Sequence, residues 1–322
     1  MPIVTVIIPT LGSSPALDKC LSSLSKQTFS DFDVIVVSNG IAMSERDLTV
    51  SRELRSRIRL IVSERNCGYG WACNMGARAT NAPFLVFLND DTYLEDNCLS
   101  ELYKSMSAQK NAVFQPIIRH VYAGQTRAGN PCDIFGATGL AFYANCGTGD
   151  FYASGASLAI SKSAFDSLGG FDEKLFLYYD DVDLGWRARL LGIEVSAAGA
   201  AFCVHSGGAS SRDMPHAQKF YFTQRNRIRV LIKDYSSRRI VARVPLAGCL
   251  ILAGAFFFAI KARSSAYLRG ALKALVWNMI ALRDTLACRY VIQRGRIESD
   301  SEIEKAMCKD SMDLCVFKRY LA

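Results

Sequence analysis

The first ninety residues alternate short apolar runs with segments of helical periodicity. The apolar runs predict strands at 3–9, 33–38, 58–62 and 84–88. Leu17, Cys20, Leu21 and Leu24 recur at helical spacing behind Ser14 and Pro15, and residues 69–80 form a second predicted helix. The run 84–88 is apolar on both faces, as expected for a central strand of a covered parallel sheet. The pattern predicts a doubly wound, mostly parallel α/β domain with its ligand site beyond the carboxyl ends of the strands.

The pattern becomes less regular after residue 111. Residues 112–151 are Gly-rich and predict mixed strands with a mobile loop. A strand at 154–160, a helix at about 180–191 and a short strand ending near His205 follow. We place this first domain at residues 1–233.

The remaining residues, 234–322, are predicted to form a helical C-terminal region. Residues 245–260 are 16 uncharged apolar residues, a helix of roughly 24 Å at ~1.5 Å per residue. Because a bilayer core is ~30 Å thick, this length favours a buried or interfacial helix over a crossing. Residues 266–286 predict an amphipathic helix lying on a membrane. The alternative is a helical hairpin packed on the first domain.

Charge adds a reason to consider a membrane. The chain has a net charge of +8, yet residues 212–296 hold 17 Lys or Arg and 3 Asp, a net of 17 − 3 = +14. A basic segment beside an apolar one predicts contact with an anionic surface, either lipid or nucleic acid. Nucleic-acid binding would interleave basic residues with exposed aromatic ones. Phe256, Phe257 and Phe258 instead lie in an uncharged run, which favours lipid, and we expect no nucleic-acid partner.

Cysteine usage and the first residues indicate the compartment. The eleven cysteines include no CxxC pair, which favours reduced, mostly buried thiols in a cytosolic protein over disulfides or a zinc site. Residues 1–10 lack the basic lead and the length of a signal peptide. We therefore expect a cytoplasmic protein, held peripherally on the inner face of the plasma membrane.

The first candidate for chemistry is Asn89-Asp90-Asp91, which directly follows the strand 84–88. A cation that neutralises a diphosphate is hard and prefers carboxylate oxygens. Side chains two apart on a strand share a face, so Asn89 and Asp91 would point together and Asp90 away. We assign Asp91 as a metal ligand and Asp90 to ribose or sugar hydroxyls. The alternative is an ordinary Asn-Asp-Asp turn.

Three acids in four residues, Asp180, Asp181 and Asp183, form the second candidate. Acids favour a helix N-terminus, and Asp183 can pair with Arg187 at i,i+4. These structural roles leave Asp180 and Asp181 less well explained. A carboxylate beside a bound cation and an acceptor hydroxyl can serve as general base.

Two further segments carry weaker signals. His205 lies among small residues, and its imidazole suits manganese as a ligand, although a lone His is usually structural or solvated. Gly68 and Gly70 suggest a dinucleotide fingerprint, but Cys73 occupies the position of the third glycine and the segment follows the third strand. We therefore reject a nicotinamide-dependent dehydrogenase. A glycine turn into a helix explains this segment equally well.

Taken in order, these segments resemble glycosyltransferase family 2. The matching segments, which span roughly residues 3–233, are 6–10, 38–40, 65–68 with Asn74, 89–91, 154–156, 169–173, 180–184, His205 and 225–227. The resemblance implies a GT-A fold and an inverting mechanism. By similarity, Asp181 is the catalytic base, and Asp91 and His205 hold Mn²⁺ or Mg²⁺.

The resemblance also implies a set of nucleotide- and sugar-binding residues. They are Pro9, Thr10, Asn39, Arg65, Asn66, Asn74, Asn89, Asp90, Gly155 and Asp180. Two of them depart from the family pattern, since Asn39 stands where many members have Asp and Asp180 where Glu is more usual. The Gln-x-x-Arg-Trp motif of processive synthases is absent, so the expected product carries one added sugar, or a few.

The subgroup that the chain resembles most is the bacterial rhamnosyltransferases of O-antigen and capsule synthesis. That likeness implies a dTDP- or UDP-sugar donor, with rhamnose or another hexose, and a saccharide acceptor that is polyprenyl-diphosphate-linked or free. A nucleotidyltransferase is the alternative enzyme. Such an enzyme would need a Gly-rich, basic loop after the first strand. Residues 11–15 hold one Gly, and the first Lys or Arg of the chain is Lys19. A non-catalytic nucleic-acid-binding protein or scaffold would not need Asp91, Asp181 and His205 together.

Overall fold

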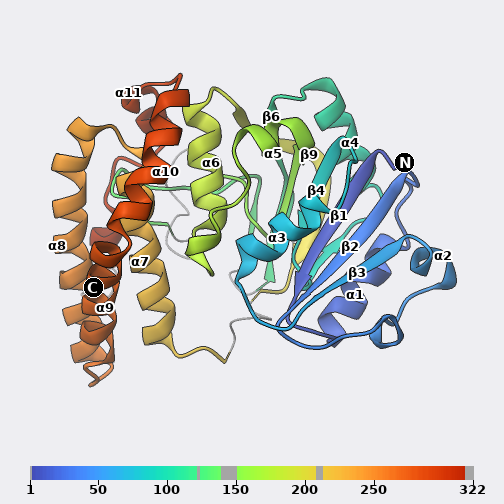
Figure 1. The fold of residues 1–322 in the computed structure, drawn as a ribbon, viewed down its shortest axis with the longest axis horizontal. Coiled ribbons are helices and arrows are strands. Elements are labelled where there is room, and N and C mark those ends of the chain that lie inside the picture. Colours follow the sequence, from blue (N-terminus) through green and yellow to red (C-terminus); the bar gives the residue numbers. More distant parts are fainter. Residues whose placement is uncertain (1, 122–123, 139–150, 208–212, 316–322) are drawn as a thin grey trace. The chain divides into compact units, whose positions relative to one another are not determined.

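The computed structural model describes residues 2–121, 124–138, 151–207 and 213–315, which form two compact units (Figure 1). The first unit holds Met1–Asn130, Tyr152–Ala188 and Ile193–Arg212. The second holds Pro131–Phe151, Arg189–Gly192 and Asp213–Ala322. The division of the chain between residues 233 and 234 stays a prediction. Much of the predicted mobile loop, residues 139–150, lies outside the described residues.

A single mixed sheet forms the centre of the first unit. Its nine strands within the described residues are β1 (Val4–Thr10), β2 (Phe32–Asn39), β3 (Ile58–Ser63), β4 (Phe84–Leu88), β5 (Thr92–Leu94), β6 (Ala112–His120), β7 (Gln125–Arg127), β8 (Ser157–Ser161) and β9 (Glu194–His205). The order across the sheet is β3-β2-β1-β4-β8-β6-β9-β5, with β7 beside β6. The first four predicted strands are confirmed to within one residue.

Strand direction changes along the sheet. Strands β1 to β4 run parallel, and β6 runs parallel to β9. Strand β8 is antiparallel to β4 and β6, and β5 is antiparallel to β9. The α/β fold class is confirmed, and the irregular second half is the mixed region that was predicted. Strand β9 has 12 residues, longer than the short strand expected there.

Helices cover both faces of this sheet (Figure 1). They are α1 (Pro15–Leu24), α2 (Arg52–Arg55), α3 (Tyr69–Arg78), α4 (Cys98–Ala108), α5 (Lys162–Ser167) and α6 (Asp180–Leu190). Helix α1 begins as predicted, because the Ser14 hydroxyl accepts the N–H of Leu17 at 3.1 Å and Pro15 occupies the first turn.

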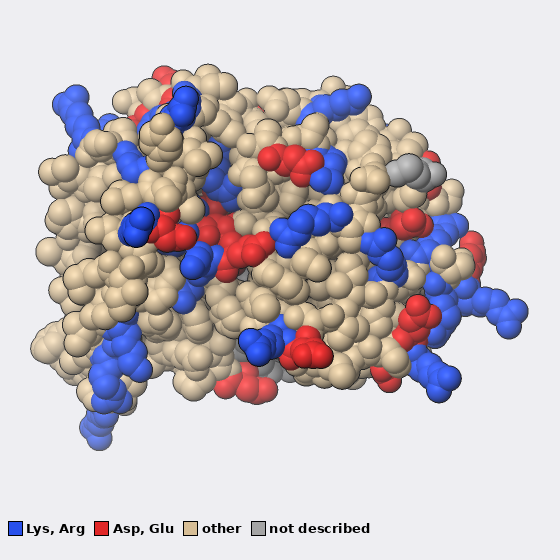
Figure 2. Space-filling model, in the orientation of Figure 1, with Lys and Arg blue, Asp and Glu red and all other residues tan. Residues whose placement is uncertain are grey.

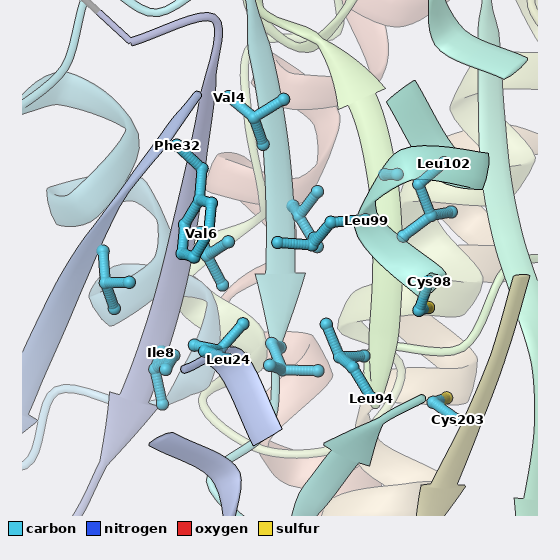
Figure 3. Close-up of a cluster of buried hydrophobic side chains, with 14 of the residues drawn as sticks. Val4, Val6, Ile8, Leu24, Phe32, Leu94, Cys98, Leu99, Leu102 and Cys203 are labelled. Atoms are coloured by element: carbon cyan, nitrogen blue, oxygen red, sulfur yellow. The ribbon is translucent and has the colours of Figure 1, made fainter. Parts of the chain in front are cut away.

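Alternation along the strands divides the core between the two faces. Val4, Val6 and Ile8 of β1 pack with α1 and α4, through residues such as Leu24 and Leu102 (Figure 3). On the opposite face, the centroid of the Phe87 ring lies 4.9 Å from that of Phe165 and 5.1 Å from that of Phe171. The sheet is thereby fixed between two helical layers, and its strand ends are rigid supports for loops.

The second unit is helical. It contains α7 (His216–Asp234), α8 (Ser237–Lys261), α9 (Ala266–Ile280), α10 (Leu282–Gly295) and α11 (Asp300–Lys305). A buried cluster of Ile228, Ile251, Ala255 and Ala271 joins α7, α8 and α9. The single helix expected over 266–286 is wrong, because Ala281 separates α9 from α10.

Helix α7 carries a row of buried cations. Arg225 lies over the ring of Trp277 at 4.4 Å, and Arg227 pairs with Asp313 at 2.8 Å. The 225–227 segment that resembled a family signature is thus held inside the second unit. Arg225 thereby contacts α9, and Arg227 connects α7 to the segment that follows α11.

Helix α8 differs from its predicted length. It continues through Pro245 for 25 residues, roughly 37 Å at ~1.5 Å per residue. By length and composition alone it is the helix, among the described residues, that could cross a membrane, and 22% of its most apolar window is buried. Residues 237–244 extend the helix beyond the predicted apolar run, so the expectation that it is too short to cross a bilayer is wrong.

Candidate active site

Asp91 and His205 lie together at one end of the sheet. Asp91 separates β4 from β5, and β5 pairs with β9 so that Thr92 lies opposite His205. Oδ1 of Asp91 is 3.1 Å from Nε2 of His205, and their side chains are only 5% and 12% exposed. The N–H of Ser206 also donates to the Asp91 carbonyl at 3.0 Å. The fold thus joins two residues that are 205 − 91 = 114 positions apart.

This pair can contribute two ligands to a divalent cation. Two adjacent ligands ~2.1 Å from an octahedral ion lie about 3.0 Å apart, close to the observed 3.1 Å. Among the described residues, no three or more His, Cys, Asp or Glu gather as a metal cluster. Two protein ligands suit an ion such as Mg²⁺ or Mn²⁺ that takes its other ligands from substrate phosphates and water. The residues therefore fit a cation that shares its coordination with a diphosphate.

Asp90 faces a different partner. Its Oδ2 accepts the hydroxyl of Thr10, at the end of β1, at 2.7 Å. Burial raises the pKa of Asp90 to about 6, against the lowering effect of the Thr10 hydrogen bond, and Asp91 adds to the rise. Asn89 holds the turn through its carbonyl, which accepts the thiol of Cys20 at 3.6 Å. The side chains of Asp90 and Asp91 therefore serve different contacts, as the strand periodicity predicts.

Asp180 and Asp181, which open helix α6, differ in accessibility. Asp181 is half-buried, while Asp180 is 3% exposed. Burial raises the pKa of Asp181, and hydrogen bonds from the N–H groups of Gly155 at 3.0 Å and Val182 at 2.9 Å oppose the rise. Asp181 is thus a carboxylate whose direction is set by two backbone N–H groups.

For Asp180 the one opposing contribution is a hydrogen bond from its own backbone N–H. Burial raises its pKa well above the ordinary value, and the nearby carboxylates of Asp181, Asp183 and Asp172 raise it further. Its Oδ1 is buried and has no hydrogen-bond partner among the described residues. A buried carboxyl that is repelled by its neighbours costs folding free energy, and such a group is typical of a functional site.

The remaining residues of this segment have the structural roles that their spacing predicts. Arg187 pairs with Asp183 at 2.6 Å inside the first unit and also donates to the Leu168 carbonyl at 2.6 Å. Val182 and Trp186 are buried. These contacts anchor α6 and leave its first two acids for chemistry.

The backbone leading into α6 is strained. Phe176, Tyr178 and Tyr179 have φ angles of 65°, 67° and 70°, a left-handed conformation that costs non-glycine residues about 1–3 kcal/mol each. The carbonyl of Phe176 accepts the N–H of Tyr69 at 2.8 Å. A Cβ on Gly68 would lie 2.5 Å from that carbonyl oxygen. Sequence reasoning treated Gly68 as an ordinary turn and missed this approach.

Asn39 and Asn66, two of the predicted binding residues, form hydrogen bonds that fix a loop. Asn39 donates to the side chain of Asn66 at 3.2 Å and to the Gly68 carbonyl at 3.0 Å, and accepts the N–H of Cys67 at 2.9 Å. These bonds fix the loop after β3 against the end of β2. The side-chain amide of Asn39 is therefore engaged before any nucleotide arrives.

Asn74 lies apart from that loop, on α3. It exchanges two hydrogen bonds of 2.9 Å with the backbone of Phe171 and donates to Glu173. Of the other predicted residues, Pro9 is half-buried on β1 and Arg65 is exposed after β3. The structure thus joins Thr10 with Asp90, Asn39 with Asn66, Gly155 with Asp181, and Asp91 with His205, but it ties Asn74 to none of them.

Two residues at the site escaped the sequence reasoning. The Tyr69 hydroxyl donates to the Gly155 carbonyl at 2.8 Å, which holds the loop that orients Asp181. His120, at the end of β6, lies opposite His205 in the sheet. Burial lowers its pKa to about 4, and His205 contributes to the lowering. A second His near the end of a strand was the only available signal for this residue.

Sequence comparisons relate the chain to known proteins. The family model described as Glycosyl transferase family 2 matches residues 5–169. The N-acetylglucosaminyl-diphospho-decaprenol L-rhamnosyltransferase of Mycobacterium tuberculosis is 27% identical over 245 residues, covering 66% of this chain and 78% of that protein. The validoxylamine A glucosyltransferase of Streptomyces hygroscopicus subsp. jinggangensis is 39% identical over 93 residues, 28% of this chain and 22% of that protein. The chain thus spans about a fifth of the latter relative's length.

A comparison of structures adds the fold. The crystal structure of GalNAc-T7 with UDP, GalNAc and Mn²⁺ matches with a TM-score of 0.56 and 16% identity, covering 71% of this chain and 48% of that chain. At this identity the likeness shows a shared fold and nothing about ligands.

Proposed function

This chain belongs to glycosyl transferase family 2, and from that premise we propose that it transfers one sugar from a nucleoside diphosphate to a saccharide hydroxyl with inversion. The observation that carries the proposal is the meeting of Asp91 Oδ1 and His205 Nε2 at 3.1 Å. The same unit holds Asp181, a half-buried carboxylate oriented by Gly155. A diphosphate-bound cation and a general base are the two elements that such a transfer needs.

In the proposed reaction Asp181 accepts the proton of the acceptor hydroxyl. The hydroxyl oxygen forms the new bond to the anomeric carbon from the side opposite the leaving group. The bond from that carbon to the diphosphate oxygen breaks, and the nucleoside diphosphate leaves with the electron pair. Mn²⁺ or Mg²⁺, when bound, supplies positive charge to the leaving diphosphate, and Asp91 and His205 would hold it.

For the donor we propose a dTDP- or UDP-sugar, with rhamnose as the first sugar to test. The mycobacterial relative is named as a rhamnosyltransferase and matches 66% of this chain, which supports this choice. Thr10 and Asp90, joined at 2.7 Å, close the end of β1 where the nucleotide would lie. The loop that Asn39 and Asn66 fix would border it.

For the acceptor we propose a saccharide on a lipid diphosphate, reached at an anionic membrane surface. The name of the mycobacterial relative specifies such a lipid-linked acceptor. In this chain helix α8 presents a stripe of exposed apolar side chains at helical spacing. They are Val241, Leu246, Leu252, Phe256 and Ile260, which are 47–77% exposed. An uninterrupted apolar helix face of this length is typical of a lipid or protein contact.

Charge favours lipid for this face. Residues 235–283 contain eight Lys or Arg and no Asp or Glu. The exposed ones are Arg238, Lys261, Arg263, Arg269, Lys273 and Arg283. Figure 2 shows blue side chains near both ends of the region over α8, with tan between them. Basic residues near an anionic leaflet contribute about 1 kcal/mol each. We therefore propose peripheral binding to the inner face of the plasma membrane.

A donor panel tests the reaction. Purified protein would be incubated with UDP- and dTDP-sugars, with Mn²⁺ or Mg²⁺ or with EDTA, and released nucleoside diphosphate measured. We expect metal-dependent turnover of one donor that Asp181→Asn abolishes. If no donor is turned over and calorimetry detects no binding of UDP or dTDP, the transferase proposal is refuted. Nucleotide binding without turnover would direct the search to lipid-linked acceptors.

A further inference from the structure

His120 has no place in the proposed reaction, yet it contacts a residue that does. It ends strand β6, which runs parallel to β9, and its Cα pairs with that of His205. The two Nδ1 atoms lie 3.3 Å apart, and the rings meet edge to face, with centroids 5.4 Å apart at 75°. His120 is buried, with only 1% of its surface exposed. The pairing of β6 with β9 therefore holds the two rings in contact.

The contact restricts where the protons can lie. Two Nδ1 atoms form a hydrogen bond only when one carries a proton and the other does not. In the structure, Nε2 of His205 faces Oδ1 of Asp91 at 3.1 Å, and a carboxylate can only accept. When the His205 proton lies on Nε2, towards Asp91, His205 accepts at Nδ1 and His120 donates from Nδ1.

We propose that His120 is a positioning residue for His205 as a metal ligand, an inference that rests on the proposed function. A ligating Nε2 offers its lone pair, so the His205 proton must lie on Nδ1. There it can donate to Nδ1 of His120, whose own proton then lies on Nε2. The pair holds two protons in both of these arrangements. His120 can thus hold the His205 ring in the metal-free and metal-bound states.

This role requires the nitrogen of His120 rather than its bulk. Ligating histidines usually donate their second N–H to a carboxylate, a backbone carbonyl or water, and loss of that partner typically lowers metal affinity 10–100-fold. Here the partner is an imidazole, which can exchange the donor and acceptor roles with His205. His120→Phe keeps a ring and removes the nitrogen. His120→Asn places an amide near the position of Nδ1.

Manganese affinity, measured by electron paramagnetic resonance of free Mn²⁺ with saturating UDP or dTDP, separates these variants. We expect His120→Phe to bind Mn²⁺ about 10–100-fold more weakly than wild type and His120→Asn to recover most of the loss. His216→Asn, at an exposed histidine in α7, is the control and should bind like wild type. Equal affinity of wild type and a folded His120→Phe would overturn the proposal.

A second measurement needs no variant. Long-range ¹H–¹⁵N spectra of the wild-type imidazoles report which nitrogen carries the proton. We expect the His205 proton on Nδ1 with diamagnetic Mg²⁺ and nucleotide. A His205 proton found on Nε2 while Mg²⁺ binds would overturn the positioning role. Wild-type protein that binds neither Mn²⁺ nor Mg²⁺ with any nucleotide would instead refute the metal part of the proposed function.

Discussion

The backbone N–H of Gly155 donates a hydrogen bond of 3.0 Å to Oδ2 of Asp181, so the loop before β8 sets the direction of the proposed base. Asp181→Asn keeps the shape of the side chain and removes its basicity. We expect kcat to fall by about 10²–10⁴-fold with little change in the Kd for UDP or dTDP. Asp166→Asn, at an exposed carboxyl paired with Lys162, is the matched control. Unchanged kcat in Asp181→Asn would remove this residue from the chemistry.

The pH dependence of turnover follows from the same carboxyl. Burial raises the pKa of Asp181 above its ordinary value, and only the ionised form can accept a proton. Activity should therefore fall as the pH is lowered, at a pH above the ordinary carboxyl range near 4. A kcat profile from pH 4 to pH 8 measures this. A profile that is flat down to pH 4 would contradict the assignment.

Asp180 is expected to destabilise the fold at neutral pH. Its pKa is raised in the folded protein, so the folded state binds a proton that the unfolded chain, with a pKa near ~3.9, has already lost. Stability then falls as the pH rises through the folded-state pKa. Asp180→Asn should raise the Tm at pH 7, by about 2–4 °C per kcal/mol gained, and the gain should shrink towards pH 4.

The contrasting variant lies on the same helix. Asp183→Asn breaks the buried pair with Arg187 at 2.6 Å and should cost about 3–5 kcal/mol. Both Tm changes can be read from calorimetric scans at pH 4 and pH 7. A lower Tm for Asp180→Asn at pH 7 would show that this carboxyl contributes to stability.

Gly68→Ala should destabilise the first unit. Gly68 has a φ of +94°, and an added Cβ would lie 2.5 Å from the Phe176 carbonyl oxygen, which cannot move freely. We expect a loss of about 2–4 kcal/mol in the free energy of unfolding, measured by urea titration. Gly169→Ala is the control, because its φ is +75° but the added Cβ meets open space. Equal losses in both variants would mean that φ alone, and not the approach of Phe176, limits this position.

The apolar face of α8 predicts a defect in membrane binding. Leu252→Ser with Phe256→Ser removes two exposed side chains that would each contribute about 1.5–3 kcal/mol if fully buried in lipid. Sedimentation with anionic vesicles should show at least a tenfold loss of binding. Val62→Ser, at an exposed apolar residue of β3, is the control. Unchanged vesicle binding would refute the proposed face, and resistance of wild type to carbonate extraction would mean that α8 crosses the bilayer.

Local patterns predicted most of the elements of the first unit. Strands β1, β2 and β4 were found to within one residue because each is a mostly apolar run that is largely buried on both faces. Helix α1 was found because Ser14 and Pro15 define its beginning. In each case the information lies within about ten residues of the chain.

The missed features depend on contacts between distant segments. His120 meets His205 only through the pairing of β6 with β9, which no local pattern specifies. Sequence also cannot separate Asp180 from Asp181, since their exposure depends on loops from elsewhere in the unit. Helix α8 was underestimated because its first two turns are basic, and Arg239 and Arg243 pair with Glu304 at 2.8 and 3.2 Å.

The antiparallel pairing of β5 with β9 has a consequence for synthesis of the protein. Ribosomes release the chain from the N-terminus, so Asp91 leaves the exit tunnel 114 residues before His205, and β5 has only three residues to hold its position meanwhile. A nascent chain that ends before residue 194 holds Asp91 but lacks the whole strand that pairs with β5. The newly made chain therefore gains its proposed cation-binding pair only after the other strands of the sheet have been synthesised.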